Sequence, residues 1–467
     1  MRLLYCVFLM LSLPASAQVI SDQVARQAAD LRDRALAGSQ AYAIVESLTT
    51  EVGPRLGGTE AEARARDWSV ATLTALGLED VRIEPFDMRT WVRGAETAAI
   101  VSPYPQPLVI TALGNSGATP RLGIEGDLVM FETLDALRQA APGSLEDKIA
   151  YVSHAMGKTQ DGSSYGYFGP VRWAGPQLAA EKGAKAILIR SVGTDSRRFP
   201  HTGGTRFGDD TDPIPAAALS APDADQIERI ASRGETVRIA MTLLPRVLGT
   251  TKSGNVIADI KGSERPEEII LTGGHLDSWD LGTGAIDDGA GVAITTAAVK
   301  LILDSGLTPK RTIRLVHWGA EEVGLLGARA YAEAHAGELT NHITGSESDF
   351  GAERVYELAT GPLSPQGQDL ARELAQILAP LGIALNEGGA TSGGPDLSPL
   401  NARGMPALRL AQDGTDYFDL HHTPDDTLDK IDAEALDQNV AAYAAFLWVL
   451  ANSDVRLRPD PGRELSQ

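Results

Sequence analysis

Apolar residues recur along this chain with two different periodicities, and the change between them divides the sequence. Residues 21–36, 40–50 and 60–76 have apolar positions three and four residues apart, which predicts amphipathic helices. Residues 81–86 alternate like a strand. From about 94 to 248, short strand-like runs alternate with glycine, proline and serine turns. This second pattern predicts a separate, mostly β module.

Beyond residue 254 the pattern becomes a regular alternation of strands and helices. Buried strands are predicted at 269–273 and 312–318, and helices follow them at 289–303 and 324–336. Later elements are the helices 366–379 and 433–451 and the strand 407–410. Such alternation predicts an α/β fold, with a mostly parallel sheet and helices on both faces. Ligand sites in these sheets lie beyond the carboxyl ends of the strands.

Length, composition and charge narrow the class of protein. A chain of 467 residues exceeds one ordinary core, so we expect two packed units. Hydrophobic residues make up 43% and charged residues 22%, which is typical of a soluble globular protein. The net charge of −21 argues against nucleic acid or an anionic membrane as a partner, because both require basic surface.

The amino terminus is typical of a secretory signal peptide. Arg2 precedes an apolar run at 3–13, and Ala15-Ser16-Ala17 forms a cleavage site of small residues. The run is too short for a bilayer core, which needs about 20 residues. We therefore expect cleavage after Ala17 and a secreted or periplasmic protein. Cys6 is the only cysteine, so the mature chain has neither disulfides nor thiolate metal ligands.

The first chemically informative stretch runs from residue 273 to 289. An apolar strand leads directly into His275, and a glycine-rich loop then carries Asp287 and Asp288 to the start of a helix. Imidazole and carboxylate groups are the ligands that zinc accepts when no thiolate is present. We expect the Asp277 carboxylate to accept the other ring N–H of His275 and fix its tautomer. Read in isolation, the same residues would be a strand-end histidine and a helix cap.

Three further pieces carry acidic or imidazole groups. Glu321 and Glu322 follow the strand 312–318, so one can bind a cation while its neighbour takes a proton from water. A glutamate pair before a helix is otherwise an ordinary complement to the helix dipole. The other two pieces are Asp349, which follows a strand-like segment, and the adjacent histidines His421 and His422.

These four pieces, in this order, resemble the co-catalytic di-zinc metallopeptidases of the leucyl aminopeptidase type, and within them the plasma glutamate carboxypeptidase (carboxypeptidase Q) group. The matching signatures are G-G-H-L-D-S-W-D at 273–280, G-A-I-D-D-G at 284–289, A-E-E-x-G-L-L-G at 320–327, E-S-D at 347–349 and H-H-T-x-x-D-T at 421–427. The resemblance implies a zinc exopeptidase fold of the phosphorylase/hydrolase-like kind. It also implies that the mostly β module is an inserted protease-associated domain.

The resemblance implies five metal ligands and two zinc ions per chain. They are Asp287, which bridges both ions, His275 and Asp349 on one, and Glu322 and His422 on the other. His422 is preferred over its neighbour because the metal histidine of the family lies four residues before the aspartate of its D-T pair, here Asp426. Glu321 would be the general base. His421 would lie beside the reacting carbonyl and steady its oxyanion, and the Asp287–Asp288 peptide would be cis.

These observations predict a domain division. It comprises a signal peptide at 1–17, the first part of the catalytic domain at 18–95, the inserted protease-associated domain at 96–249, the catalytic di-zinc domain at 250–455 and a tail at 456–467.

The resemblance implies hydrolysis of dipeptides or short peptides at the N-terminal residue. Acidic candidates for binding an amino terminus are Asp396, Asp413, Asp416 and Asp419, whereas Arg403 and Arg409 could bind a carboxylate. A carboxypeptidase, and a non-catalytic or one-zinc relative, therefore stay open as alternatives. We expect a peptide substrate, no nucleic-acid partner and no membrane partner, and we leave a homodimer open.

Overall fold

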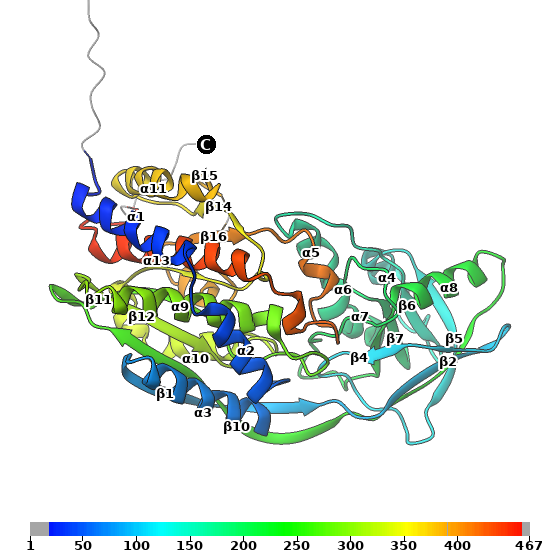
Figure 1. Cartoon of the computed structure of the whole chain (residues 1–467). Coiled ribbons are helices and arrows are strands. Elements are labelled where there is room, and N and C mark those ends of the chain that lie inside the picture. The colour runs from blue at the N-terminus through cyan, green and yellow to red at the C-terminus, as the bar shows by residue number, and fades with distance from the viewer. Residues whose placement is uncertain (1–17, 390, 460–467) are drawn as a thin grey trace, which may run out of the picture.

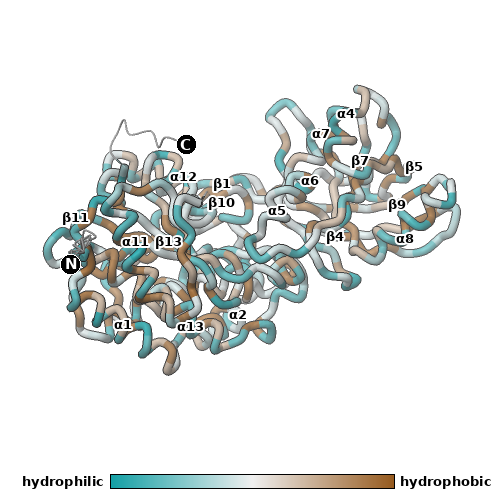
Figure 2. Tube along the Cα trace, turned by 90° about the horizontal axis from the view of Figure 1, so that it is seen from above, coloured by the Kyte–Doolittle hydropathy of each residue, from teal (hydrophilic) through white to brown (hydrophobic). Residues whose placement is uncertain are grey.

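Two lobes, joined by a pair of long strands, make up the protein (Figure 1; Figure 2). The computed structural model describes residues 18–389 and 391–459. The strands β1 (Glu79–Val92) and β10 (Arg246–Ile260) pair antiparallel and lead from the first lobe to the second. The predicted signal peptide lies outside the described residues. None of the described helices is both long and apolar enough to cross a bilayer.

The sheet of the first lobe is mixed, whereas the sequence predicted a mostly parallel one. Within the described residues its order is β1-β10-β12-β11-β13, where β11 is Arg265–His275, β12 is Arg311–Trp318 and β13 is His342–Glu347. β11 is parallel to β12 and β13, but β10 is antiparallel to both β1 and β12. The prediction was wrong because β10 is the return strand from the second lobe. It pairs with β1 and so enters the sheet in the opposite direction.

Helices cover both faces of this sheet, as predicted. On one face, the helices α3 (Glu60–Ala75), α9 (Ala290–Asp304) and α13 (Ala433–Asn452) contact the strands. The helices α1 (Asp22–Leu36) and α2 (Ala41–Glu51) pack against α9 and α13. The other face carries α10 (Leu326–Ala334) and α12 (Ser398–Asn401). In the strands β10, β11 and β12, residues of the two cores alternate. In β10, for example, Val256 and Ala258 contact the larger helical layer and Ile257 contacts the smaller one.

A small second sheet extends the first lobe. It consists of β15 (Ala384–Asn386), β14 (Val355–Thr360) and β16 (Leu408–Gln412), in that order, and α11 (Pro365–Leu378) belongs to the same region. His317 is fully buried in β12. It bonds Ser69 of α3 at 2.7 Å and Thr296 of α9 at 2.9 Å.

The second lobe, described without gaps over residues 96–243, is built on an eight-stranded sheet. Its order is β3-β2-β9-β5-β6-β7-β8-β4. The strands are β2 (Glu96–Ser102), β3 (Gln106–Leu108), β4 (Ile110–Ala112), β5 (Ile124–Phe131), β6 (Ile149–Val152), β7 (Ala186–Arg190), β8 (Ala216–Leu219) and β9 (Arg238–Leu243). The helices are α4 (Leu134–Gln139), α5 (Ser163–Phe168), α6 (Pro170–Trp173), α7 (Gly175–Glu181) and α8 (Ala221–Ala231). The sequence predicted a mostly β module, but the helices α4 to α8 are also present.

The loop that follows His275 anchors the second lobe to the first. Arg93 makes a two-pronged ion pair with Asp280 of this loop, at 2.9 Å on each prong. The same guanidinium bonds Thr202 of the second lobe at 2.9 Å. Trp279 belongs to the second lobe's core and packs so closely on Gly114 that a Cβ there would collide with the indole ring. The second lobe is therefore held against the loop that carries the candidate ligands.

Candidate metal centre

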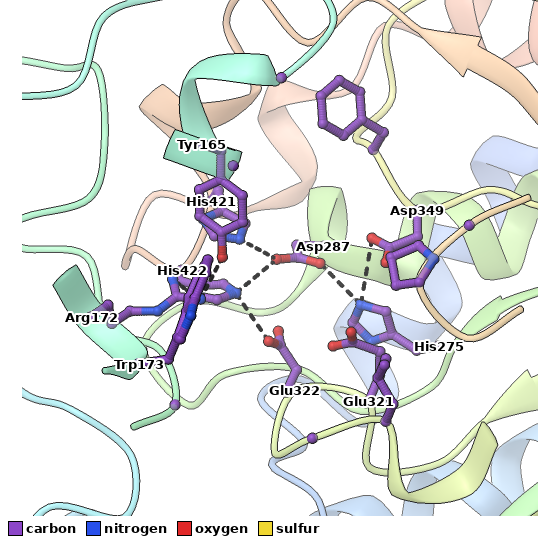
Figure 3. A pocket seen from close by; sticks show the side chains of 18 of the residues that line it. Tyr165, Arg172, Trp173, His275, Asp287, Glu321, Glu322, Asp349, His421 and His422 are labelled. Carbon is purple, nitrogen blue, oxygen red and sulfur yellow. Dashed lines mark hydrogen bonds and ion pairs between the residues drawn. The ribbon is translucent and has the colours of Figure 1, made fainter. Parts of the chain in front are cut away.

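A cavity of about 640 Å³, lined by residues of both lobes, contains most of the side chains that the sequence singled out (Figure 3). Its floor lies at the carboxyl ends of three adjacent strands. His275 is the last residue of β11, Glu321 and Glu322 follow β12, and Asp349 follows β13. This is the edge where α/β sheets place their ligands.

One group on the cavity floor consists of His275, Asp287 and Asp349. Nε2 of His275 lies 3.1 Å from Oδ1 of Asp287 and 3.8 Å from Oδ1 of Asp349. Nδ1 of His275 donates to the backbone carbonyl of Asp277 at 2.9 Å. Because that nitrogen carries the hydrogen, the lone pair of Nε2 faces the two carboxylates. The three residues can hold one metal ion.

A second group lies on the other oxygen of Asp287. Nε2 of His422 is 3.3 Å from Oδ2 of Asp287 and 3.0 Å from Oε2 of Glu322. His421 also approaches Asp287, at 3.6 Å, and its ring stacks on His422. Both histidines could join Asp287 around a cation, but only His422 also contacts Glu322. The geometry therefore agrees with His422 as the partner of Glu322, with Asp287 shared between two sites.

The electrostatics of the floor fit a cation pair. Burial raises the pKa of Glu322 well above its usual value, and the charge of Asp287 adds to the shift. Burial also raises the pKa of Asp349, to about 6. Among the described residues, Oδ2 of Asp287 and Oε1 of Glu322 are buried without a hydrogen-bond partner. Buried carboxylates are costly unless a cation or donors compensate them, and divalent ions with nitrogen and oxygen ligands supply that compensation.

Glu321 lines the same cavity beside these two groups but belongs to neither of them. Its backbone N–H donates to Oδ1 of Asp277 at 2.9 Å, which orients the turn after β12. Burial raises the pKa of the Glu321 carboxyl well above its usual value. A carboxyl that gains a proton readily beside a cation site has the properties of a general base that later returns the proton.

The role expected for the Asp277 carboxylate was wrong. Its Oδ1 lies 3.8 Å from Nδ1 of His275, too far for a hydrogen bond. The strand ends at His275, so Asp277 no longer follows the strand's alternation, and its carbonyl takes the place expected for the carboxylate. The tautomer of His275 is still fixed, but by the main chain, while the carboxylate holds the backbone of Glu321.

Asp288 holds the backbone around the ligands. Its carboxylate accepts the N–H of His275 at 3.0 Å and that of Gly291 at 3.1 Å. A Cβ on either Gly274 or Gly291 would collide with this carboxylate, so both positions require glycine. The Asp287–Asp288 peptide is cis, as the resemblance implied.

Arg55 supports the metal centre, although no sequence motif indicated it. It belongs to the loop before α3, and its side chain is 0% exposed. The guanidinium donates to the carbonyls of Leu276 at 2.5 Å, Thr283 at 2.7 Å and Gly284 at 2.8 Å. These carbonyls bracket the loop between His275 and Asp287. Arg55 thus ties both ends of the ligand-bearing loop together and places a buried positive charge beside the carboxylates.

The second lobe holds the histidine pair. The N–H of Thr202 donates to the carbonyl of His422 at 3.0 Å, and Nδ1 of His201 bonds the carbonyl of His421 at 2.7 Å. His201 also pairs with Asp195 at 2.5 Å. Its partner is local and serves to orient the loop.

Comparisons with known proteins agree with these features. A model of peptidase family M28 matches residues 255–447. Carboxypeptidase Q of Bos taurus is 34% identical over 440 residues, which are 93% of this chain and 90% of that protein. The chain belongs to peptidase family M28.

Solved structures of M28 peptidases share this fold. The M28 peptidase precursor of Shewanella amazonensis SB2B is 50% identical, with a TM-score of 0.91 over 94% of this chain and 99% of that one. A zinc aminopeptidase from Bacillus subtilis is 21% identical, with a TM-score of 0.65 over 89% of this chain and 96% of that one. At that identity the second likeness concerns the fold alone.

We predict that Arg55→Met weakens metal binding by this M28 peptidase by about 10- to 100-fold, the usual cost of losing a residue that orients ligands. Competition with a chromophoric chelator measures the affinity. Arg55→Lys should recover part of it, because an ammonium keeps the charge but cannot reach three carbonyls. Arg206→Met is the matched control, since Arg206 is an exposed arginine on the cavity wall. Unchanged affinity in Arg55→Met would contradict the role.

Proposed function

We propose that this M28 peptidase is a zinc-dependent exopeptidase that releases the N-terminal residue of dipeptides and other short peptides. The observation that carries the proposal is the pair of groups sharing Asp287, with Glu321 beside them on the floor of one cavity. A cavity of about 640 Å³ accommodates a short peptide. A non-catalytic relative would not need Glu321 in addition to the two groups.

The proposed metal ligands are the predicted set. His275 and Asp349 would hold one zinc ion, Glu322 and His422 the other, and Asp287 would bridge them. When bound, the ions would supply positive charge that acidifies a water molecule and stabilises a developing oxyanion. The all-nitrogen and oxygen donor set is one that zinc accepts.

Glu321 performs the proton transfers in this proposal. Its carboxylate takes a proton as the water oxygen adds to the scissile carbonyl carbon. The C–N bond then breaks, and Glu321 returns the proton to the leaving nitrogen, so the carboxylate is regenerated. The raised pKa of Glu321 suits this cycle because the carboxyl retains the proton long enough to deliver it.

The distribution of charge in the cavity supports an amino terminus at the floor. Burial raises the pKa of Glu321 and Asp349 on the floor, and a neighbouring α-ammonium group would stabilise the ionised form of such carboxylates. Of the acidic residues considered from sequence, Asp396 is fully buried, and Asp416 and Asp419 pair with Lys158. Asp413 accepts hydrogen bonds from Gln160 and Thr415. Asp349, which lines the cavity floor, is therefore the better candidate for contact with an amino terminus.

Arg409 favours a second candidate, cleavage at the carboxyl end. It lines the same cavity, with its guanidinium over the ring of Phe350 at 5.0 Å and no ion pair among the described residues. A free guanidinium binds a carboxylate well. The similarity to carboxypeptidase Q adds to this candidate, whereas Arg403, the other arginine considered, bonds the carbonyl of Ala332.

We further propose that the chain is exported and that the second lobe is a protease-associated domain inserted into the catalytic domain. The signal-like segment at 1–17 supports export. The return of the chain through β10 to pair with β1 supports an insertion. The domain boundaries and a homodimer stay predictions.

Dipeptides blocked at one end distinguish an aminopeptidase from a carboxypeptidase. The zinc-loaded protein should hydrolyse a free dipeptide and its C-terminal amide, but not the N-acetylated form, because acetylation removes the ammonium charge. Product release measured by chromatography checks this. Cleavage that survives N-acetylation but not C-amidation would overturn the aminopeptidase proposal in favour of the carboxypeptidase.

Glu321→Gln tests the proton transfers. This variant should keep both zinc ions and lose about 10²- to 10⁴-fold in kcat, the usual contribution of a positioned acid–base. Steady-state kinetics and metal content are the measurements. Glu333→Gln, the same change at an exposed position on α10, is the control. A Glu321→Gln protein with nearly full turnover would show that another residue is the base.

A further inference from the structure

The second lobe places two polar side chains in the wall of the catalytic cavity. Tyr165 comes from α5 and Arg172 from α6, and both line the cavity together with the candidate metal residues. Figure 3 shows Tyr165 close to His421, with its hydroxyl end directed towards the group that Asp287 and His422 form. These residues lie outside the motifs that identify the family.

We propose that Tyr165 is a catalytic residue, whose phenolic O–H donates to the oxygen of the scissile carbonyl as that oxygen becomes negative, and that Arg172 is its positioning residue. This inference rests on the proposed peptidase function. It makes the second lobe part of the reaction centre.

The hydrogen bond between the two residues determines which way the phenol can donate. Nη2 of Arg172 bonds Oη of Tyr165. A guanidinium has donors only, so the phenol oxygen must be the acceptor. The hydroxyl hydrogen therefore points elsewhere, and among the described residues no acceptor receives it. A donor without a partner, on the wall of a reaction cavity, is free to bind a substrate oxygen.

The surroundings of Tyr165 keep this hydrogen in place and the ring rigid. Burial raises the pKa of Tyr165 to about 12, so the phenol stays protonated at neutral pH. Its ring stacks on Phe418 at 4.8 Å and meets His421 edge-on at 5.2 Å. A donor held in this way is preorganised, and so it stabilises charge without a cost of reorientation.

Arg172 is itself held tightly. Its residue is 7% exposed, and Nη1 lies 3.1 Å from Nδ1 of His422 and 3.5 Å from the carbonyl of Thr202. A Cβ on Gly203 would collide with the guanidinium, so the glycine provides the space for it. The guanidinium therefore lies between the Tyr165 phenol and His422, a candidate metal ligand. It holds Tyr165 at a fixed position relative to the metal centre.

The chemical step balances with Tyr165 as a donor. When the water oxygen adds to the carbonyl carbon, the π electrons move onto the carbonyl oxygen, and the phenol hydrogen bond to that oxygen strengthens. When the C–N bond breaks, the electrons return to form the carboxyl product. Tyr165 keeps its proton throughout, and the proton delivered to the amine comes from Glu321.

Tyr165→Phe removes only the hydroxyl and is the direct test. We expect kcat for a free dipeptide to fall by about 10²- to 10³-fold, the usual loss for one oxyanion donor, with KM changed by less than about threefold. Zinc content and Tm should stay at the wild-type values. Tyr167→Phe is the matched control, because Tyr167 lies on the same helix and is 69% exposed.

A tetrahedral inhibitor distinguishes donation from a packing role. A phosphinic dipeptide analogue should bind Tyr165→Phe more weakly by about the same factor as kcat falls, whereas product amino acids should bind equally well. Wild-type kcat in Tyr165→Phe, or a fall in kcat without weaker phosphinate binding, would overturn the inference. A wild-type protein that cleaves no peptide would instead refute the proposed function.

A double-mutant cycle tests Arg172. Arg172→Gln should lower kcat in the wild-type background, and should lower it much less in Tyr165→Phe, because its partner is already missing. Zinc content is measured in all four proteins so that an effect through His422 is recognised. Equal losses in both backgrounds at full zinc content would overturn the positioning role.

Discussion

The structure depends on one buried carboxylate that is shared between two histidines. Asp287 presents one oxygen to His275 and the other to His422, in a floor where further carboxylates are buried with raised pKa values. Such a concentration of buried negative charge is unfavourable on its own. The surrounding features of the site compensate for it, hold its backbone, or place a substrate against it.

The buried positive charge of Arg55 compensates part of this negative charge. Arg55 is fully buried, yet it donates to main-chain carbonyls and forms no close ion pair among the described residues. Its charge therefore remains available to the whole carboxylate group while its hydrogen bonds shape the loop. Asp288 acts in the complementary way, because it accepts backbone N–H groups and leaves Asp287 to face the cavity. The conformation of the loop is thus fixed both through its carbonyl groups, by Arg55, and through backbone N–H groups, by Asp288.

The second lobe makes direct contacts with the residues around the candidate metal centre. Trp279 and Asp280 fix it to the loop after His275, while Thr202 and His201 hold the carbonyls of the histidine pair. Tyr165 and Arg172 extend this contact into the cavity. A lobe with these attachments orders one wall of the site.

Much of this could be predicted from sequence, for identifiable reasons. The apolar patterns of β11, β12, α9 and α13 predicted these elements, and the resemblance to the family predicted that His275, Glu322 and Asp349 lie together. The direction of β10 could not be predicted, because it depends on pairing with a distant strand. Arg55 has partners that are carbonyls more than 200 residues away, which leave no side-chain pattern. The carboxylate of Asp277 was misplaced because the strand was assumed to continue, and α5 and α6 are too short for a periodicity.

The central claim is that Asp287 joins two metal sites. Calorimetric zinc titration of metal-free protein tests it most directly, with wild type compared with Asp287→Asn and Glu322→Gln. The account predicts two zinc ions per wild-type chain, one tight ion in Glu322→Gln, and loss of tight binding at both sites in Asp287→Asn. Two tight ions in Asp287→Asn, or the loss of only one, would contradict a shared ligand.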